Sequence, residues 1–185
     1  FVACLTASIC VPISLALGIV AAMYPGSLYD RILTLISVSL VAAPEFLTAT
    51  ILVLLFVFAL GVGNAIVMGS TEGKGVFELI AHFALPITTL CFVIASQLIR
   101  MSRAAVLNVM SSPYIEMAIL KGVPRRRIIF RHALLNAVGP IVNVVALNLA
   151  YLVTGVIVVE VYFGYNGLAT LIVQGVQTRD MSLIH

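Results

Sequence analysis

Four long, continuous apolar runs limit what this chain can fold into. They cover residues 1–23, 32 to about 60, about 79–99 and about 137–159. A helix needs about 20 apolar residues to cross the hydrocarbon core of a bilayer, and each run reaches that length. A closed β-barrel, the other structure that can span a membrane, would show alternating segments of about ten residues instead. The runs therefore predict membrane-spanning helices.

The overall composition leads to the same fold class. Of the 185 residues, 62% are hydrophobic and only 9% are charged, and the mean hydropathy is +1.20. A water-soluble domain is about half apolar and about a quarter charged, so it could not bury this much apolar surface. We predict an all-α integral membrane protein, a polytopic helical bundle in which residues 1–185 form a single domain.

The second apolar run contains a break at Pro44 and Glu45. Either the first part of the run lies partly in the membrane interface, or one helix is kinked there. An ionisable residue inside a membrane segment is costly and by default indicates a pathway or a pore-facing site. A break at Pro44 would instead place Glu45 at an interface, and the sequence leaves both interpretations open. Residues 24–31 and the glycine-rich residues 61–78 are predicted to be loops.

The positive charges are concentrated in one part of the chain. Seven of the ten Lys and Arg residues lie between Arg100 and Arg131. Lys and Arg accumulate in cytoplasmic loops, so this stretch is predicted to be cytoplasmic, with Arg100 and Arg103 at the cytoplasmic end of the third span. Alternation then places residues 24–31 in the cytoplasm and residues 61–78 and 160–185 outside it, although Lys74 opposes this orientation. A nucleic-acid surface is disfavoured, because it would have to operate between two spans.

Residues 111–140, SSPYIEMAILKGVPRRRIIFRHALLNAVGP, predict a helix, a tight turn and a second helix. A serine caps the first helix before Pro113, Gly122 ends it, and Pro124 begins the next one. The apolar stripe of the first helix consists of Ile115, Ala118, Ile119 and Val123. A basic loop required only by membrane topology would explain the arginines, but not so closely specified a stop and restart. An amphipathic hairpin of this kind suits docking into a groove on a cytoplasmic partner.

Several other candidate sites fail on their sequence context. Residues 69–75, GSTEGKG, lack the spacing and the hydroxyl residue of a phosphate-binding loop, and no strand precedes them. No metal-binding or catalytic spacing of histidines, cysteines or serines is present, so the sequence suggests neither a metal site nor covalent catalysis. The scattered residues concerned are His82, His132, His185, Cys4, Cys10 and Cys91.

Polar residues also occur within the third and fourth spans. Such residues more often join helices through hydrogen bonds than bind substrate, and in either role they would face the interior of the bundle. They are Gln97, Asn143, Asn148 and Thr154. After the fourth span, residues 160–180 are consistent either with a short external helix bounded by glycines or with a plain loop.

Two groups of residues resemble a known family. Glu116-Met117-Ala118, followed after three residues by Gly122, resembles the EAA loop of permease subunits of binding-protein-dependent ABC importers. The continuation is similar to the dipeptide, oligopeptide and nickel branch, through Arg131, His132, Ala133, Leu134, Asn136, Ala137 and Pro140. The B-type permease pattern E-x-x-F-x-x-x-G-L followed by R-D is matched by Glu160, Phe163, Gly167, Leu168, Arg179 and Asp180. Met117 and Asn166 depart from the usual Ala and Pro.

This resemblance implies a type I ABC importer transmembrane domain of about six spans. The four visible spans would be the second to the fifth, so the chain would be a fragment that lacks the first and the last. Residues 111–135 would be the cytoplasmic coupling segment, seated in a cleft of a separate ATPase subunit. The coupling residues implied are Glu116, Ala118, Gly122, Arg125, Arg126 and His132.

The resemblance also implies partners and a location. We expect a homologous second permease, two ATPase subunits that bind the ATP, an extracytoplasmic substrate-binding protein, and the lipid bilayer of a bacterial or archaeal cytoplasmic membrane. The chain itself would need no cofactor and would carry peptides or a similar small solute. Candidate pathway residues are Glu45, Gln97, Asn143 and Asn148. Candidate external residues are Glu160, Phe163, Gly167, Arg179 and Asp180. The alternative is a passive channel or membrane scaffold with a basic docking loop.

Overall fold

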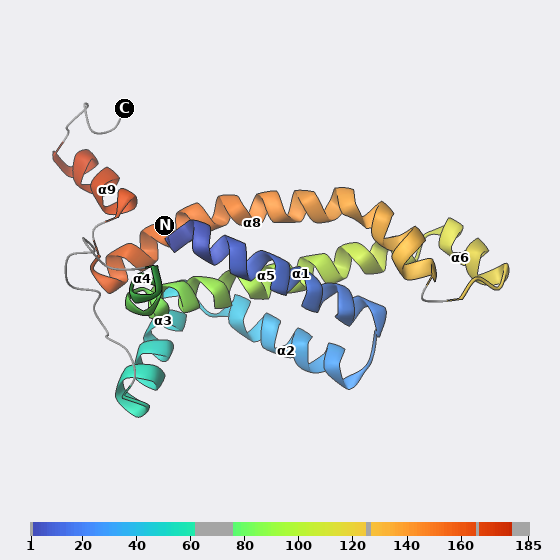
Figure 1. Ribbon diagram of the computed structural model, residues 1–185, viewed down its shortest axis with the longest axis horizontal. Coiled ribbons are helices and arrows are strands. Elements are labelled where there is room, and N and C mark those ends of the chain that lie inside the picture. Colours follow the sequence, from blue (N-terminus) through green and yellow to red (C-terminus); the bar gives the residue numbers. More distant parts are fainter. Residues whose placement is uncertain (1, 62–75, 125–126, 166, 179–185) are drawn as a thin grey trace. The chain divides into compact units, whose positions relative to one another are not determined.

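The computed structural model describes residues 2–61, 76–124, 127–165 and 167–178 (Figure 1). The regular elements in these ranges are helices, which confirms the predicted all-α class. In chain order they are α1 (Val2–Met23), α2 (Leu28–Ala42), α3 (Glu45–Val53), the π-helical η1 (Leu54–Ala59), α4 (Val76–His82), α5 (Ala84–Met110), α6 (Pro113–Leu120), the π-helical η2 (Ile128–Ala133), α8 (Leu134–Phe163) and α9 (Leu168–Thr178).

Three of the described helical stretches are long and apolar enough to cross a membrane. They are Val2–Met23, Ala84–Met110 and Ile128–Phe163. A fourth span is present if α2 and the stretch Glu45–Ala59 together form one broken crossing. The break lies at Pro44, where the sequence predicted an interruption, because proline has no backbone N–H and disfavours a helical residue before it.

The predicted limits of two loops are wrong, because helices begin within them. The turn predicted over residues 24–31 is shorter, because α2 already begins at Leu28, and the loop predicted over residues 61–78 gives way to α4 at Val76. Residues 62–75 of that loop lie outside the described residues, together with the GSTEGKG segment.

The helices that carry the third and fourth spans also extend beyond the predicted ends of those spans. Arg100 and Arg103 do not mark the end of a helix, because α5 continues to Met110. The fourth helical stretch begins at Ile128 and ends at Phe163, so the second helix of the predicted hairpin is continuous with the span. Hydropathy reports where the bilayer begins and ends, whereas a helix can continue into water on favourable helix formers such as Met, Arg and Ala.

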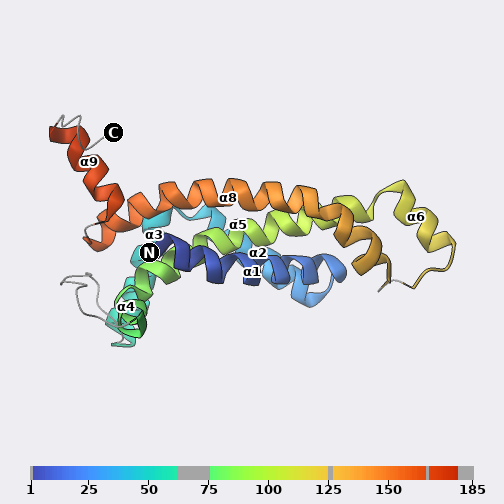
Figure 2. The same ribbon diagram turned by 45° about the horizontal axis from the view of Figure 1, so that its top comes forward.

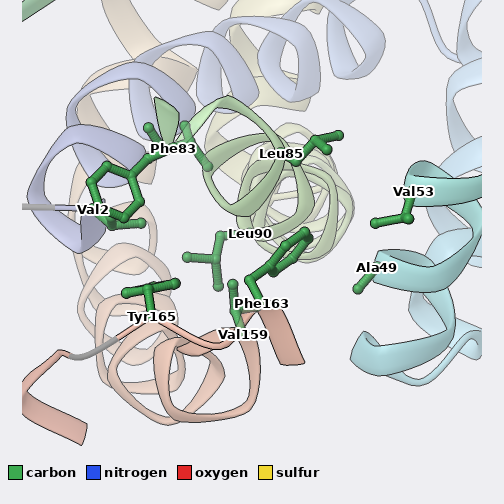
Figure 3. Close-up of a cluster of buried hydrophobic side chains, with 10 residues drawn as sticks. Val2, Ala49, Val53, Phe83, Leu85, Leu90, Val159, Phe163 and Tyr165 are labelled. Atoms are coloured by element: carbon green, nitrogen blue, oxygen red, sulfur yellow. The ribbon is translucent and has the colours of Figure 1, made fainter. Parts of the chain in front are cut away.

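The helices form two compact units, which are described separately. The first comprises Phe1–Ala7, Ala43–Val93 and Tyr151–His185. Its core is a cluster of buried apolar side chains in which Leu90, Val159 and Phe163 are at most 1% exposed (Figure 3). Phe83 and Tyr165 meet edge to face at the margin of this cluster, with ring centroids 5.2 Å apart. This packing joins the end of α8 to the first part of α5.

The second unit comprises Ser8–Ala42 and Ile94–Ala150. Gly18 of α1 lies directly against α5, where an added Cβ would be 2.7 Å from the Ile99 carbonyl oxygen and closer still to Ser102 Oγ. Small residues permit this close approach between membrane helices. At the end of this unit α6 lies beyond the adjoining ends of α5 and α8 (Figures 1 and 2).

An ion pair joins the start of α2 to α5 in the same unit. Arg103 Nη2 donates a hydrogen bond of 2.8 Å to Asp30 Oδ2, and its Nε donates to Oδ1. The Gly26 N–H also donates to Asp30 Oδ2 at 2.9 Å, while the Asp30 N–H donates to Ser27 Oγ. Asp30 is 3% exposed. The bidentate geometry and the extra donor compensate for the desolvation of this carboxylate.

Candidate functional site

The candidate coupling segment begins at a turn between α5 and α6. Ser112 occupies the N-cap position with an extended backbone, and Pro113 is the first helical residue, as predicted. The predicted capping by a serine side chain is wrong, because the Ser112 hydroxyl donates backward to the Val109 carbonyl. The turn is therefore tied to the last turn of α5, and α6 begins on a preset proline φ angle.

The structure confirms that Gly122 ends the first helix of the segment. This residue has φ +73°, the left-handed conformation that glycine adopts without a Cβ penalty. Its N–H donates to the Ile119 carbonyl at 2.9 Å, and the Val123 N–H donates to the Ala118 carbonyl at 3.1 Å. These two bonds constitute a Schellman motif, which satisfies the last carbonyls of the helix. The Pro124 carbonyl then accepts from the Arg127 N–H at 2.8 Å.

A small apolar cluster holds the segment together from within. Ile115, Ile128 and Ala133 are at most 2% exposed and bring α6 against η2. Ala118 and Val123 pack on the same cluster, which supplies the hydrophobic contact that accompanies a Schellman motif. Of the apolar stripe predicted for the first helix, Ile119 alone is misplaced, since it is 57% exposed.

The opposite face of α6 points away from this cluster. Leu120 is 78% exposed and Met117 is 55% exposed, and Glu116, Lys121 and Gly122 are exposed beside them. The surface therefore combines apolar side chains, one acidic group and one basic group. His132, also predicted to take part in coupling, is half-buried in η2, whereas Arg125 and Arg126 lie outside the described residues.

One contact in this segment is not predictable from local sequence patterns. Asn136 Nδ2 donates to Tyr114 Oη at 3.0 Å and to the His132 carbonyl at 2.9 Å. The amide therefore links the first turn of α6 to the start of α8. Asn136 had been matched only as part of the family pattern, and no local spacing rule connects it to a tyrosine 22 positions earlier.

The candidate pathway residues differ in their environments. Asn148 is 2% exposed, and its Nδ2 donates to the Val144 carbonyl at 2.8 Å and contacts Met101 Sδ at 3.7 Å. Its Oδ1 has no protein partner among the described residues. Gln97 is half-buried and Asn143 is exposed. Asn148 thus contacts α5 from α8, whereas Asn143 and Thr154 are exposed and do not face the interior as predicted.

Glu45 belongs to the other unit and lies in the first turn of α3. Its side chain is half-buried beside Gly155 of α8, where an added Cβ would be 3.2 Å from one carboxylate oxygen and 3.4 Å from the other. Among the described residues none donates a hydrogen bond to this carboxylate or forms an ion pair with it. An ionisable residue in a membrane segment is by default a candidate for a functional site.

The candidate external residues form a compact group. Glu160 and Phe163 lie in the last turns of α8, not beyond the span as predicted, because α8 continues to Phe163. Gly164, with φ +68°, ends that helix. The Glu160 carboxylate is 4% exposed and accepts hydrogen bonds from the Thr170 N–H at 3.0 Å and the Thr170 hydroxyl at 3.2 Å. Arg179 and Asp180 lie outside the described residues.

Tyr165 closes this group from the side of the core. It is 9% exposed, and its hydroxyl has no hydrogen-bond partner among the described residues. Burial, and then the nearby Glu160 carboxylate, raise the pKa of the Tyr165 phenol far above its usual value. The Tyr165 ring packs edge to face beside Phe83.

Comparison with known proteins decides the family. Residues 14–185 match the model of the binding-protein-dependent transport system inner membrane component. The chain belongs to this family. The match includes the candidate coupling segment, the α8 span and the Glu160 group, so it covers all the motifs on which the resemblance rested.

Members of this family from several bacteria are similar to the chain over most of its length. It is 32% identical over 181 residues to the probable peptide ABC transporter permease protein y4tP of Sinorhizobium fredii. The aligned region covers 97% of this chain and 57% of that protein. It is 33% identical over 170 residues to the glutathione transport system permease protein GsiC of Escherichia coli K12. This aligned region covers 92% of this chain and 53% of that protein. The chain therefore spans about half the length of these relatives.

Proposed function

We propose that the chain is part of the permease subunit of an ATP-driven importer and that α6 couples it to a separate ATPase. The observation that carries this proposal is the construction of α6. Its inner face is fixed by the cluster around Ile115, and its end is fixed by the Schellman motif at Gly122. Its outer face leaves Leu120 and Glu116 exposed. A short rigid helix with an exposed apolar and acidic face suits a groove on a partner protein.

The mechanism follows from this rigidity. Because α6 is packed on η2 and hydrogen-bonded to α8 through Tyr114 and Asn136, displacement of α6 by the ATPase would be transmitted to these elements rather than absorbed by a flexible loop. A partner driven by ATP can in this way bias a transport domain between two states. ATP binding and hydrolysis belong to the separate subunits. Under this proposal Glu116 meets a basic group of the ATPase, and Arg125, Arg126 and His132 flank the contact.

The cargo we propose is a peptide or a similar small solute such as glutathione. Support comes from the relatives, whose names refer to peptide and to glutathione transport. A homologous second permease and an extracytoplasmic substrate-binding protein complete the assembly. Glu45, Gln97, Asn143 and Asn148 are our candidates for the translocation path. Of these, Glu45 has the strongest structural support, since its carboxylate lies unpartnered against Gly155.

Co-purification of the ATPase tests the coupling role. The native full-length subunit would be co-expressed with its ATPase subunits, and retention of the ATPase would be measured for wild type, Glu116→Ala and Leu120→Ala. A matched control is Leu28→Ala, since Leu28 is 75% exposed but lies at the start of α2. We expect the two α6 variants to lose at least about tenfold in affinity, as buried interface anchors do, and the control to retain it.

Two results would contradict this proposal. If wild type and all variants retain the ATPase equally, α6 is not the coupling element. If wild type retains no ATPase although all subunits are expressed, a passive channel or membrane scaffold replaces the importer as the best interpretation.

A further inference from the structure

Helix α9 begins without a capping side chain of its own. Gly167 occupies the position before its first residue, and glycine has no side chain to accept a hydrogen bond from the first-turn N–H groups. The missing acceptor comes from α8, because the Glu160 carboxylate accepts from the N–H of Thr170, the third residue of α9. This is the N–H that an N-cap side chain usually satisfies, and a negative charge there is favoured by the helix dipole.

Gly167 is part of the same arrangement. An added Cβ at this position would overlap the Glu160 carboxylate, contacting both oxygens and the carbon between them. The backbone of the turn therefore lies directly on the carboxylate, and only glycine leaves the space. The Thr170 hydroxyl completes the contact by donating to the same carboxylate oxygen at 3.2 Å, with the Tyr165 carbonyl also within reach at 3.4 Å.

We propose that Glu160 is a positioning residue that fixes α9 on the end of α8. The carboxylate is buried and is held by two donors from one residue, so the angle at which α9 leaves the turn is set by α8 rather than by the intervening loop. The functional consequence rests on the proposed function. If the chain is an importer permease, Glu160 sets the position of the external helix during delivery of cargo by the binding protein.

A distance measurement tests the geometry without reference to transport. Spin labels would be placed at Val158 on α8 and Val176 on α9, both exposed positions, in a cysteine-free full-length subunit within its membrane complex. We expect a narrow distance distribution for wild type and for Glu160→Gln, because the amide oxygen can still accept the Thr170 N–H. Glu160→Ala should broaden or shift the distribution. An unchanged distribution in Glu160→Ala would overturn the proposal.

The overlap at Gly167 supplies a second, independent test. Gly167→Ala should disturb α9 as Glu160→Ala does, because the new methyl group displaces the carboxylate. In the double variant the methyl group has space, so the second substitution should add little to the first. Val161→Ala, one residue along α8 and exposed, is the matched control and should change nothing. Additive effects of the two substitutions would show that Glu160 and Gly167 act separately, against the proposal.

Stimulation of the ATPase by the binding protein then tests the functional consequence in the reconstituted complex. The concentration of loaded binding protein that gives half-maximal ATPase stimulation should rise about tenfold in Glu160→Ala, as expected for the loss of a charge-assisted hydrogen bond. Glu160→Gln should restore most of the response, which general damage to the fold would not permit. If α9 is displaced but the response to binding protein is unchanged, the functional part fails. If wild type shows no stimulation, the proposed function fails instead.

Discussion

The stop at Gly122 allows a quantitative test of the coupling segment. A side chain added there meets no atom within 4 Å, so replacement introduces no steric clash and only the backbone conformation matters. An L-residue at φ +73° is disfavoured by about 1–2 kcal/mol, which corresponds to about a 5- to 30-fold change in an equilibrium constant. Gly122→Ala should therefore open the Schellman turn that much more often, and Gly122→Asn should have a smaller effect, because Asn tolerates this conformation.

Hydrogen exchange of the full-length subunit measures this opening directly. The Val123 N–H donates to the Ala118 carbonyl only while the turn is closed, so its exchange rate reports the fraction of open turns. Gly139→Ala is the matched control, because Gly139 also has no atom within 4 Å of an added Cβ but lies inside α8. There the substitution should slow local exchange, since Ala favours a helix by up to about 1 kcal/mol over Gly. Equal exchange rates of the Val123 N–H in wild type and Gly122→Ala would contradict this prediction.

Three further predictions concern the helices themselves. Arg103→Ala should lower the free energy of unfolding by about 3 kcal/mol, because it leaves the buried Asp30 carboxylate unpaired. Asp30→Ala should cost less, because the remaining Arg103 side chain is 26% exposed, and the exchange of the two residues should recover part of the loss in detergent melts. Gly18→Ala should lower the free energy of unfolding by about 1–3 kcal/mol through overpacking. Melting curves of the double variant Gly18→Ala with Ser102→Ala should show only part of this loss restored, since the Ile99 carbonyl still contacts the new methyl group. Glu45→Gln should raise thermal stability but reduce transport, and equal transport would remove this residue from the path.

The sequence predicted those features that depend on neighbouring residues. Gly122 was recognisable as a helix end because a positive φ is a local property of glycine, and the break at Pro44 follows from the missing N–H. Long apolar runs predicted the helical class because the length and hydropathy of a run are also local properties of the sequence. The ends of the helices were less accurate, because Arg103 continues α5 while bonded to Asp30, 73 positions away in the sequence. No hydropathy profile contains that partner.

The chemistry of the candidate sites was predictable to a smaller extent. Glu160 and Gly167 were found by family pattern, but their contact depends on how the chain folds back after Gly164. The link between Tyr114 and Asn136 likewise requires α6 and α8 to be packed already. Ser112 failed as a side-chain cap because a competing acceptor, the Val109 carbonyl, lay within reach of its hydroxyl. Such choices between alternative partners are made by the three-dimensional structure.

The π-helical turn η2 sets the rotational orientation of α6 relative to α8. The Leu134 N–H bonds to the Ile129 carbonyl, five residues back, so this stretch holds one residue more than an α-helical turn would. That extra residue allows Ile128 and Ala133 both to face α6 while α8 continues in regular register. Deleting one exposed residue of η2, Phe130, would keep α6 and α8 but rotate one by about 100° relative to the other. The direction in which the outer face of α6 points is thus encoded by residue count, independently of its side chains.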